Sequence, residues 1–395
     1  MKKTYITLFA VLLAFTLSAQ ALDGRIIAVT PGADTGAYTP VSVPYDGPAP
    51  GGRVEVVNQA TDEAAPATIY GGALIFVPAS LEAEQEHRFA VRVLDDDAAP
   101  RVRLEHDAEA GAVAVYIRDE HFTTYNFGND LRIPFLWPVH AEGGVTITRN
   151  FPMGPDEPVE GRKDHPHHVS LWTAFGDVNG ADTWHRAPIR TQSIVVESGD
   201  ALGVIRAHNV WCDTDGAPQV DEIREYRFYD GPAGVRFIDQ TIAFVAAHGE
   251  VVFGDNKEGL VAFRIRPEIQ GNEAGLLTNA EGMQRERRVY GTPVPWMDYS
   301  GPIGGIGNRG IALFSHPGNF RPPCWHVRDY GLFAANPFAL SDVCRMDEGG
   351  AYTLAEGENL TLLYRYFVHS GDVEEAGVAQ RYDDFAVTPK AAWAE

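Results

Sequence analysis

The fold is decided by short runs such as Val113-Ala114-Val115-Tyr116-Ile117-Arg118, in which β-branched and aromatic residues predominate. These residue types favour extended strands, because their side chains pack well on a pleated sheet. No long segment shows a convincing 3.6-residue repeat of apolar residues. The chain of 395 residues also holds 40 glycines and 26 prolines, which fits many turns. The sequence therefore predicts an all-β protein. Comparable runs cover residues 193–197, 235–239, 259–266 and 360–369.

Two β regions follow from the spacing of these runs. Residues 22–98 hold short β-prone runs separated by turns rich in proline and glycine, which is typical of a small immunoglobulin-like sandwich. Residues 95–100 read as a linker. The strands of residues 101–390 are too many for one small sandwich, so we predict a large two-sheet β-sandwich there. One short helix is expected over residues 374–382.

The first 21 residues have the pattern of a secretory signal peptide. Lys2 and Lys3 precede a mostly apolar run over residues 6–17, and Ala19-Gln20-Ala21 provides a small-x-small cleavage site. We expect cleavage after Ala21 and a periplasmic or secreted protein, with an uncleaved anchor as the alternative. The apolar run is too short for a comfortable membrane span and no other stretch reaches its length, so no span is expected after cleavage.

The charge and the cysteines restrict partners and chemistry. The chain carries 54 acidic and 32 basic residues, a net charge of −22, which repels nucleic acid and anionic membranes. Nucleic acid is therefore not expected as a partner. Among the three cysteines, Cys324 and Cys344 are a candidate disulfide pair with Cys212 left over, and three free buried thiols are the alternative.

The densest group of titratable residues is Asp164-His165-Pro166-His167-His168-Val169-Ser170-Leu171-Trp172, followed by Asn179, Trp184 and His185. Imidazoles transfer protons, and indole faces stack on flat ligands such as sugars. Pro166 disfavours a helix. If the run after it is a strand, alternation places His168, Ser170 and Trp172 on an open, functional face and Val169 and Leu171 toward the core. The alternative is that these histidines only cap strand ends.

A metal site is a second interpretation of this segment. Asp164, His165 and His167 are the residues that would bind the ion. Adjacent residues of a strand point apart, and the segment lacks the HExxH pattern of many zinc enzymes. We therefore expect no cofactor, and a metal ion remains the alternative.

Two further segments carry candidate site residues. In Gly254-Asp255-Asn256-Lys257-Glu258-Gly259, Glu258 is a candidate general acid or base whose pKa Lys257 can tune, and Asp255 is a second carboxylate. A charged turn is the alternative. Residues 316–331 form a loop constrained by proline and glycine, in which Asn319, Arg321 and His326 are candidate binding residues. A structural surface loop is the alternative.

At these segments the sequence resembles a bacterial family of unknown function, DUF6807. Its members often carry the label of a methane oxygenase, PmoA. That oxygenase subunit spans the membrane, so methane or copper chemistry is not expected for this chain. The family commonly has arginine where this chain has Val169. The matching residues are 164–168 through Trp172, 176–180 with Trp184, 255–259, Asn319, Arg321 through Trp325, Tyr330-Gly331 and 336–338.

Proteins of this kind are similar to large β-sandwich carbohydrate enzymes of the galactose mutarotase type. In those enzymes a histidine and a carboxylate on the concave face of a sheet do acid/base work on a sugar. The resemblance implies that His167 or His168 is the acid here and Glu258 the base.

These observations together predict a secreted protein that does acid/base chemistry on a sugar or glycoside, as a hydrolase, lyase or epimerase. His165, His167 and His168 would transfer protons, with Glu258 and Asp255 as partner carboxylates. Two alternatives remain open: a non-catalytic glycan-binding protein, and a metal-dependent oxidoreductase or hydrolase. The substrate-binding residues would be Arg321, Asn319, Asn179 and His326, with Trp172 and Trp184 as stacking platforms.

Overall fold

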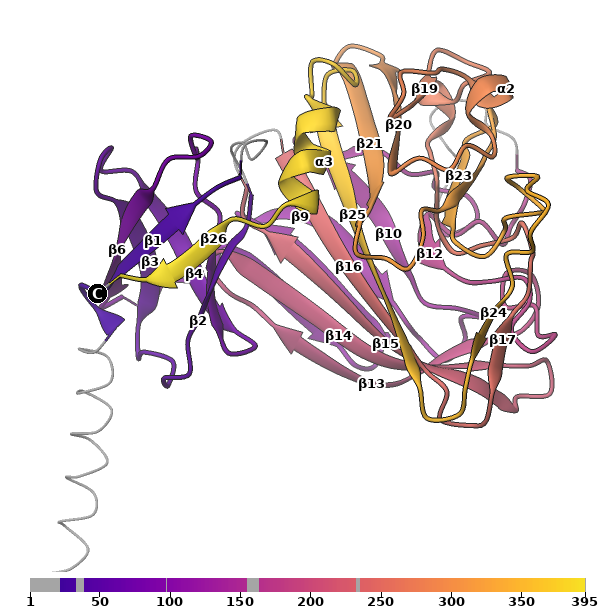
Figure 1. The fold of residues 1–395 in the computed structure, drawn as a ribbon, viewed down its shortest axis with the longest axis horizontal. Helices are drawn as coiled ribbons and strands as arrows, with labels where there is room; N and C mark the ends of the chain where they lie inside the picture. Colours follow the sequence, from indigo (N-terminus) through magenta and orange to yellow (C-terminus); the bar gives the residue numbers. More distant parts are fainter. Residues whose placement is uncertain (1–21, 33–38, 97, 155–162, 232–234, 395) are drawn as a thin grey trace, which may run out of the picture.

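The computed structural model describes residues 22–32, 39–96, 98–154, 163–231 and 235–394, which form an almost wholly β protein (Figure 1). The predicted signal peptide lies outside the described residues. The prediction of an all-β sandwich fold is confirmed, because antiparallel sheets of seven, nine and eight strands dominate the described part of the chain. No helix in these ranges is long and apolar enough to cross a membrane.

The seven-stranded sheet is built by the N-terminal region and completed by the C-terminus (Figure 1). Its order is β2-β5-β4-β3-β6-β1-β26, and β26 pairs antiparallel with β1. The two end strands meet where Trp393 Nε1 donates to the carbonyl of Pro44 at 2.7 Å. The sheet thus curls around its own apolar core. Its strands are β1 (Ile26–Thr30), β2 (Val41–Pro44), β3 (Arg53–Asn58), β4 (Ala64–Tyr70), β5 (Ala73–Phe76), β6 (His87–Leu94) and β26 (Lys390–Trp393).

The nine-stranded sheet forms one layer of a large sandwich. Its order is β22-β23-β18-β12-β10-β9-β8-β7, with β11 paired to β10. Strands β12, β18, β22 and β23 are buried along their whole length, so other parts of the chain cover both of their faces. The strands are β7 (Val102–Asp107), β8 (Ala112–Ile117), β9 (Glu120–Asn126), β10 (Phe135–Ala141), β11 (Val145–Thr146), β12 (Leu171–Thr173), β18 (Val261–Arg264), β22 (Cys324–Val327) and β23 (Leu332–Asn336).

The eight-stranded sheet is the other layer, in the order β13-β14-β15-β16-β25-β21-β20-β19. Along β16 the inward residues Ile238, Gln240, Ile242 and Phe244 alternate with less buried ones, as expected for a strand packed on one face. Its strands are β13 (Ile189–Glu197), β14 (Leu202–Cys212), β15 (Pro218–Tyr229), β16 (Val235–Val245), β19 (Leu276–Asn279), β20 (Trp296–Ile303), β21 (Gly307–Ser315) and β25 (Asn359–Ser370).

Few other elements exist in the described residues. Strands β17 (Val251–Phe253) and β24 (Tyr352–Leu354) form a small separate sheet. The predicted C-terminal helix is present as α3 (Val378–Ala386), a few residues later than expected. A short 3-10 turn, η1 (Pro267–Ile269), and a single helical turn, α2 (Glu286–Val289), complete the chain.

The core of the sandwich lies between the eight- and nine-stranded sheets. Phe263 of β18 stacks on Phe333 of β23 at 4.4 Å between ring centroids, and Phe263 also meets Tyr366 of β25 in the opposite sheet. A buried ion pair lies in this core, where Arg224 Nε donates to Glu222 Oε1 at 2.6 Å. These contacts show that Phe263 and Phe333 point to the inside of the sandwich, so their strand neighbours point outward.

The small module packs against one end of the eight-stranded sheet. Thr68 Oγ1 of β4 accepts from the amide of Ala201 at 2.9 Å, and Tyr70 donates to Glu225 of β15 at 2.8 Å. Apolar side chains from both regions form a shared cluster that includes Ile75, Leu202 and Phe237. The two regions are therefore joined by packing as well as by the chain.

The position of β26 generates a stability prediction. Replacing Trp393 by alanine removes the contacts of its indole with Pro44, Tyr45 and the Arg25 guanidinium. We expect the module to lose about 2 kcal/mol of unfolding free energy, the worth of one large partly buried side chain. Denaturant unfolding measures the loss, with Lys390→Ala, an exposed site on the same strand, as the control. Equal stability of the two variants would contradict the role given to β26.

Candidate active site

One row of side chains crosses the outer face of the nine-stranded sheet. His326 of β22 lies opposite Ala334 of β23, Ala334 opposite Ala262 of β18, and Ala262 opposite Trp172 of β12. Residues directly opposite in neighbouring strands share a face. Because the alternate positions, such as Phe263, point into the core, this row points outward. Because alanine side chains are small, Ala334 and Ala262 form a shallow stretch of sheet surface between the His326 imidazole and the Trp172 indole.

The histidine segment is a turn above this surface rather than a strand. Pro166 and His167 form the turn, and β12 begins only at Leu171. Ser170 has a φ of 64°, a left-handed conformation that breaks the extended alternation of side chains. The predicted open face is therefore wrong. His168, Ser170 and Trp172 are all buried, with exposures of 1%, 0% and 0%.

Two buried arginines bind this segment through a single carboxylate. Asp164 Oδ1 accepts from Arg149 at 3.0 Å and from Arg264 of β18 at 2.8 Å. Arg149 also donates to the carbonyls of Asp164 and His165, at 2.9 and 3.1 Å. Burial alone would raise the pKa of Asp164, but Arg264 and His165 hold it below its ordinary value. Asp164 is thus a charged anchor for the turn.

His168 is fixed as a neutral hydrogen-bond acceptor. Its Nδ1 lies 2.9 Å from Arg264 Nη1, and a guanidinium can only donate, so Nδ1 carries no proton. Burial, with the nearby Arg264, places the pKa of His168 far below its ordinary value. Its ring stacks on Trp172 at 5.2 Å between centroids. The prediction that His168 transfers protons is wrong, because the side chain is enclosed and held in one protonation state.

His165 and His167 remain partly exposed above His168. The His165 ring stacks between His168 at 4.8 Å and Tyr330 at 5.1 Å, measured between ring centroids. Its Nδ1 lies 3.2 Å from Asp164 Oδ1, and its side chain is 39% exposed. His167 meets the edges of His168 and His185, each at 4.5 Å between ring centroids. The structure therefore brings these two predicted proton-transfer residues together.

His167 is neutral over the physiological pH range. Burial, with His185, His165 and Arg132 nearby, lowers its pKa to about 4, while Glu258 acts in the opposite direction. Within the described residues, its Nε2 is enclosed and has no hydrogen-bond partner. Nδ1 is therefore the ring nitrogen with which a substrate can exchange a proton.

A third arginine holds the loop that carries Trp184 and His185. Arg132 donates to the carbonyls of Thr183, Trp184 and Ala187, the last two at 2.9 and 3.2 Å. His185 Nδ1 lies 3.0 Å from Asp182 Oδ2. Trp184 itself is fully buried and packs on Trp172 at 5.1 Å between ring centroids. The predicted role of Trp172 and Trp184 as stacking platforms is wrong, because neither indole reaches the surface.

Glu258 lies near enough to His167 to affect its pKa. Its Oε1 forms an ion pair with Lys257 Nζ at 3.0 Å, and its Oε2 lies 3.8 Å from His326 Nδ1. His326 donates that Nδ1 proton to the carbonyl of Lys257 at 3.0 Å. Burial lowers the pKa of His326 to about 4, against the pull of Glu258. His326 thus supports the Glu258 loop from below and is too buried, at 3% exposed, to bind substrate as predicted.

Three other predicted site residues have structural roles. The Asp255 carboxylate accepts from the amides of Ser341, Asp342 and Gly350, at 2.9, 3.1 and 2.6 Å. The Asn179 amide bridges the backbone of Glu250 and Val252. The Asn319 amide pairs with both backbone groups of Leu363 in β25. The catalytic role of Asp255 and the binding roles of Asn179 and Asn319 stay predictions, and in the structure these side chains bind backbone groups.

Asp164, one of the three residues of the alternative metal site, is paired with two arginines instead. The described residues contain no group of three or more His, Cys, Asp or Glu side chains arranged to hold a metal. Asp164 faces two guanidiniums, whose charge opposes a cation at the same oxygen. At the histidine turn, His165 and His167 make ring contacts with neighbouring aromatic and imidazole side chains.

Arginines 132 and 149 were missed by sequence reasoning. Each gathers several backbone carbonyls of a distant loop, 15 to 55 positions along the chain. A single arginine within a strand-rich segment carries no spacing signal, so only the folded structure reveals these contacts. The disulfide between Cys324 and Cys344 was a candidate pair, and the structure contains it, with Cys212 buried and free.

Comparisons with known proteins agree with the sequence resemblance. The chain matches the family described as "Family of unknown function (DUF6807)" over residues 112–383. None of the curated proteins matches it. Among solved structures, the Slr1438 protein from Synechocystis sp. PCC 6803 is similar at 11% identity and a TM-score of 0.26, covering 69% of this chain and 97% of that one. A similarity this low carries no functional argument.

The lowered pKa of His326 generates a prediction about stability. Below the ordinary value of 6.5 the unfolded chain takes up a proton that the folded histidine, with a pKa of about 4, does not. The stabilisation is therefore complete above pH 6.5 and is lost as the pH falls toward 4. As the pH is lowered across this range, the melting temperature should fall more steeply for the native chain than for the His326→Asn variant. The asparagine keeps a donor for the carbonyl of Lys257. Parallel curves would show that His326 titrates normally.

Proposed function

The chain belongs to the DUF6807 family, whose function is unknown, and we propose from the site itself that it is a proton-transfer enzyme. His165 and His167 exchange protons with the substrate, and Glu258 is the complementary acid or base. Sugars and glycosides are the proposed substrates, with hydrolysis, elimination or epimerisation as the reaction class. The protein is proposed to act in the periplasm or outside the cell.

One observation carries this proposal: the partly exposed His165 ring lies beside the anchored Asp164 carboxylate. The carboxylate oxygen lies 3.2 Å from Nδ1, close enough for an electrostatic interaction with the ring, although the two atoms do not form a hydrogen bond. A carboxylate beside the imidazole of a general base is a recurring arrangement in enzymes.

Glu258 supplies the second group that acid/base chemistry needs. Its carboxylate is largely buried, with 16% of the side chain exposed, and pairs with Lys257. It lies near enough to His167 and to Tyr330 to raise the pKa of both, although burial is the largest influence on each. Two groups of different chemistry thus influence each other electrostatically, and such a pair is what is needed to move a proton on and off a substrate.

The substrate class and the compartment rest on different support. A sugar is proposed by fold-level analogy, because proteins of the family that the site motifs resemble are similar to β-sandwich carbohydrate enzymes of the galactose mutarotase type. An oxidising compartment is supported by the Cys324–Cys344 disulfide, since such bonds persist mainly outside the cytoplasm.

A substrate screen with matched variants tests this proposal. Glycosides and uronate polymers are offered to the native protein, and product formation is followed by mass spectrometry. For any substrate that is turned over, His165→Asn and Glu258→Gln should each lower kcat by about 10²- to 10⁴-fold, the usual worth of a general acid or base. His208→Asn, which changes a half-buried histidine of β14 in the other sheet, should leave kcat unchanged.

The outcomes separate the alternatives. Saccharide binding without turnover, preserved in Glu258→Gln, would indicate a glycan-binding protein. Turnover that needs an added metal ion would revive the metal-dependent interpretation. Full activity in both His165→Asn and His167→Asn would remove the proton-transfer role of the cluster.

A further inference from the structure

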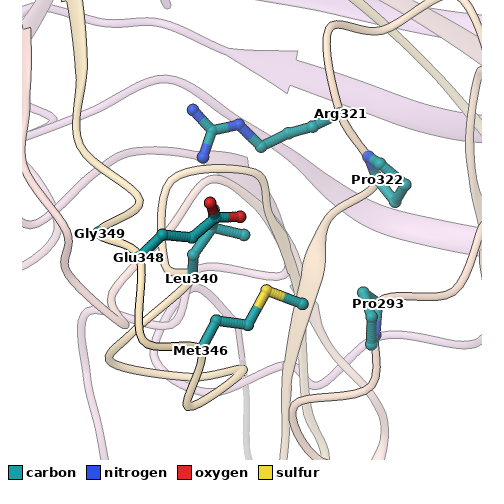
Figure 2. A pocket seen from close by; sticks show the side chains of 7 residues that line it. All are labelled: Pro293, Arg321, Pro322, Leu340, Met346, Glu348 and Gly349. Carbon is teal, nitrogen blue, oxygen red and sulfur yellow. The ribbon is translucent and has the colours of Figure 1, made fainter.

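A cavity of about 500 Å³ opens beside the segment 340–349, and none of the histidines lines it (Figure 2). Arg321 and Glu348 face each other across this cavity. The remaining wall is apolar and comes from Pro293, Pro322, Leu340 and Met346. Arg321 was predicted to bind substrate in the histidine site, and the structure places it in this separate opening instead.

The Arg321 side chain is held in place, but its donors are not used. Its guanidinium lies over the Phe320 ring at 4.6 Å from the centroid. Among the described residues, no carbonyl, hydroxyl or carboxylate accepts a hydrogen bond from it, although a guanidinium offers five N–H donors. Burial lowers the pKa of Arg321, while Glu348 and Asp255 oppose that change, so the group stays charged. A planar fork of this kind matches the two oxygens of a carboxylate.

Glu348 adds a complementary acceptor. Within the described part of the chain, no ion pair of 4 Å or less joins Glu348 to Arg321, so the two charges face a common space. An ionised carboxylate accepts hydrogen bonds only. A ligand that fits both groups therefore carries an anionic end and a donor such as a hydroxyl or an ammonium group.

The walls of the cavity are fixed before any ligand binds. The Asp255 carboxylate accepts from three backbone amides of residues 341–350, the segment that carries Met346 and Glu348. The disulfide ties the same segment to β22, with the Cα atoms of Cys324 and Cys344 5.6 Å apart. A pre-ordered cavity loses less conformational entropy on binding, which favours affinity for a small ligand.

We propose that this cavity is a second binding site, for a small carboxylate ligand that also carries a hydroxyl or amino donor. Arg321 binds the carboxylate, Glu348 accepts from the donor, and Leu340 and Met346 cover the apolar face of the ligand. Sugar acids and amino acids share this chemistry. The site goes beyond the proposed proton transfer and does not depend on it.

Binding of three probes to the full chain tests the proposal. D-glucuronate and L-leucine each carry a carboxylate and a donor, and D-glucose is the neutral match for glucuronate. Isothermal titration or ligand-observed NMR should show saturable binding of at least one of the two carboxylates and none of glucose at the same concentration. Tighter binding of glucuronate would indicate a sugar acid as the ligand, and tighter binding of leucine would indicate an amino acid. Saturation by neither carboxylate would overturn the proposal.

Variants locate the binding. Arg321→Gln should weaken binding of the carboxylate by about 10-fold or more, since a hydrogen bond to a charged group is worth roughly 1.5–3 kcal/mol. Glu348→Gln should weaken carboxylate binding less than Arg321→Gln does. It should also reduce the advantage of ligands that carry a hydroxyl or amino donor. Arg88→Gln, an exposed arginine of the small module, is the matched control. Circular dichroism confirms that each variant is folded.

The result also distinguishes this site from the proposed active site. If His165→Asn abolishes binding of the probe and Arg321→Gln does not, the probe occupies the histidine cluster, and the second site is wrong while the proton-transfer proposal stands. If Arg321→Gln alone weakens binding, the second site is supported whether or not the histidine cluster is catalytic.

Discussion

One carboxylate oxygen holds the proposed site together. Asp164 Oδ1 accepts from both Arg149 and Arg264, and these arginines in turn fix the carbonyls and the imidazole of the histidine turn. Two guanidiniums at 1% side-chain exposure need an anion, because an unpaired buried charge costs several kcal/mol. The ion pairs of Asp164 therefore hold the turn against the outer face of β18 and β12, together with side-chain packing.

This constraint divides the histidines by role. His168 is used as an acceptor for Arg264 and as a ring that packs on Trp172, so it serves the structure. His165 and His167 lie one layer further out, where Tyr330, His185 and Glu258 surround them. The turn and the Arg132 loop cover the outer face of the sheet, which explains why β12 and β18 are buried on both sides. Structure and candidate chemistry are thus built from the same short segment.

The sequence was sufficient for the fold class, because strand propensity is local: runs near residues 113 and 235 became β8 and β16 where expected. It also identified the segment that holds the site. The sequence did not predict which side chains are exposed. The left-handed backbone at Ser170 interrupts the strand alternation that was assumed for residues 168–172. Sequence reasoning also gave catalytic or binding roles to Asp255 and Asn319, whose polar groups satisfy distant backbone atoms. Such long-range hydrogen bonds leave no trace in residue spacing, and the same is true of the return of β26 to the N-terminal sheet.

Proton transfer by the histidine turn and Glu258 requires that His167 and Glu258 share one electrostatic environment, and an NMR titration of the His167 ring tests this without a substrate. The account predicts a pKa of about 4 for His167 in the native chain, assigned by comparison with His167→Asn, and a further decrease in Glu258→Gln, because the carboxylate raises that pKa. A pKa near the ordinary value of 6.5 that does not respond to Glu258→Gln would contradict the account, since the two groups would then be neither buried together nor coupled.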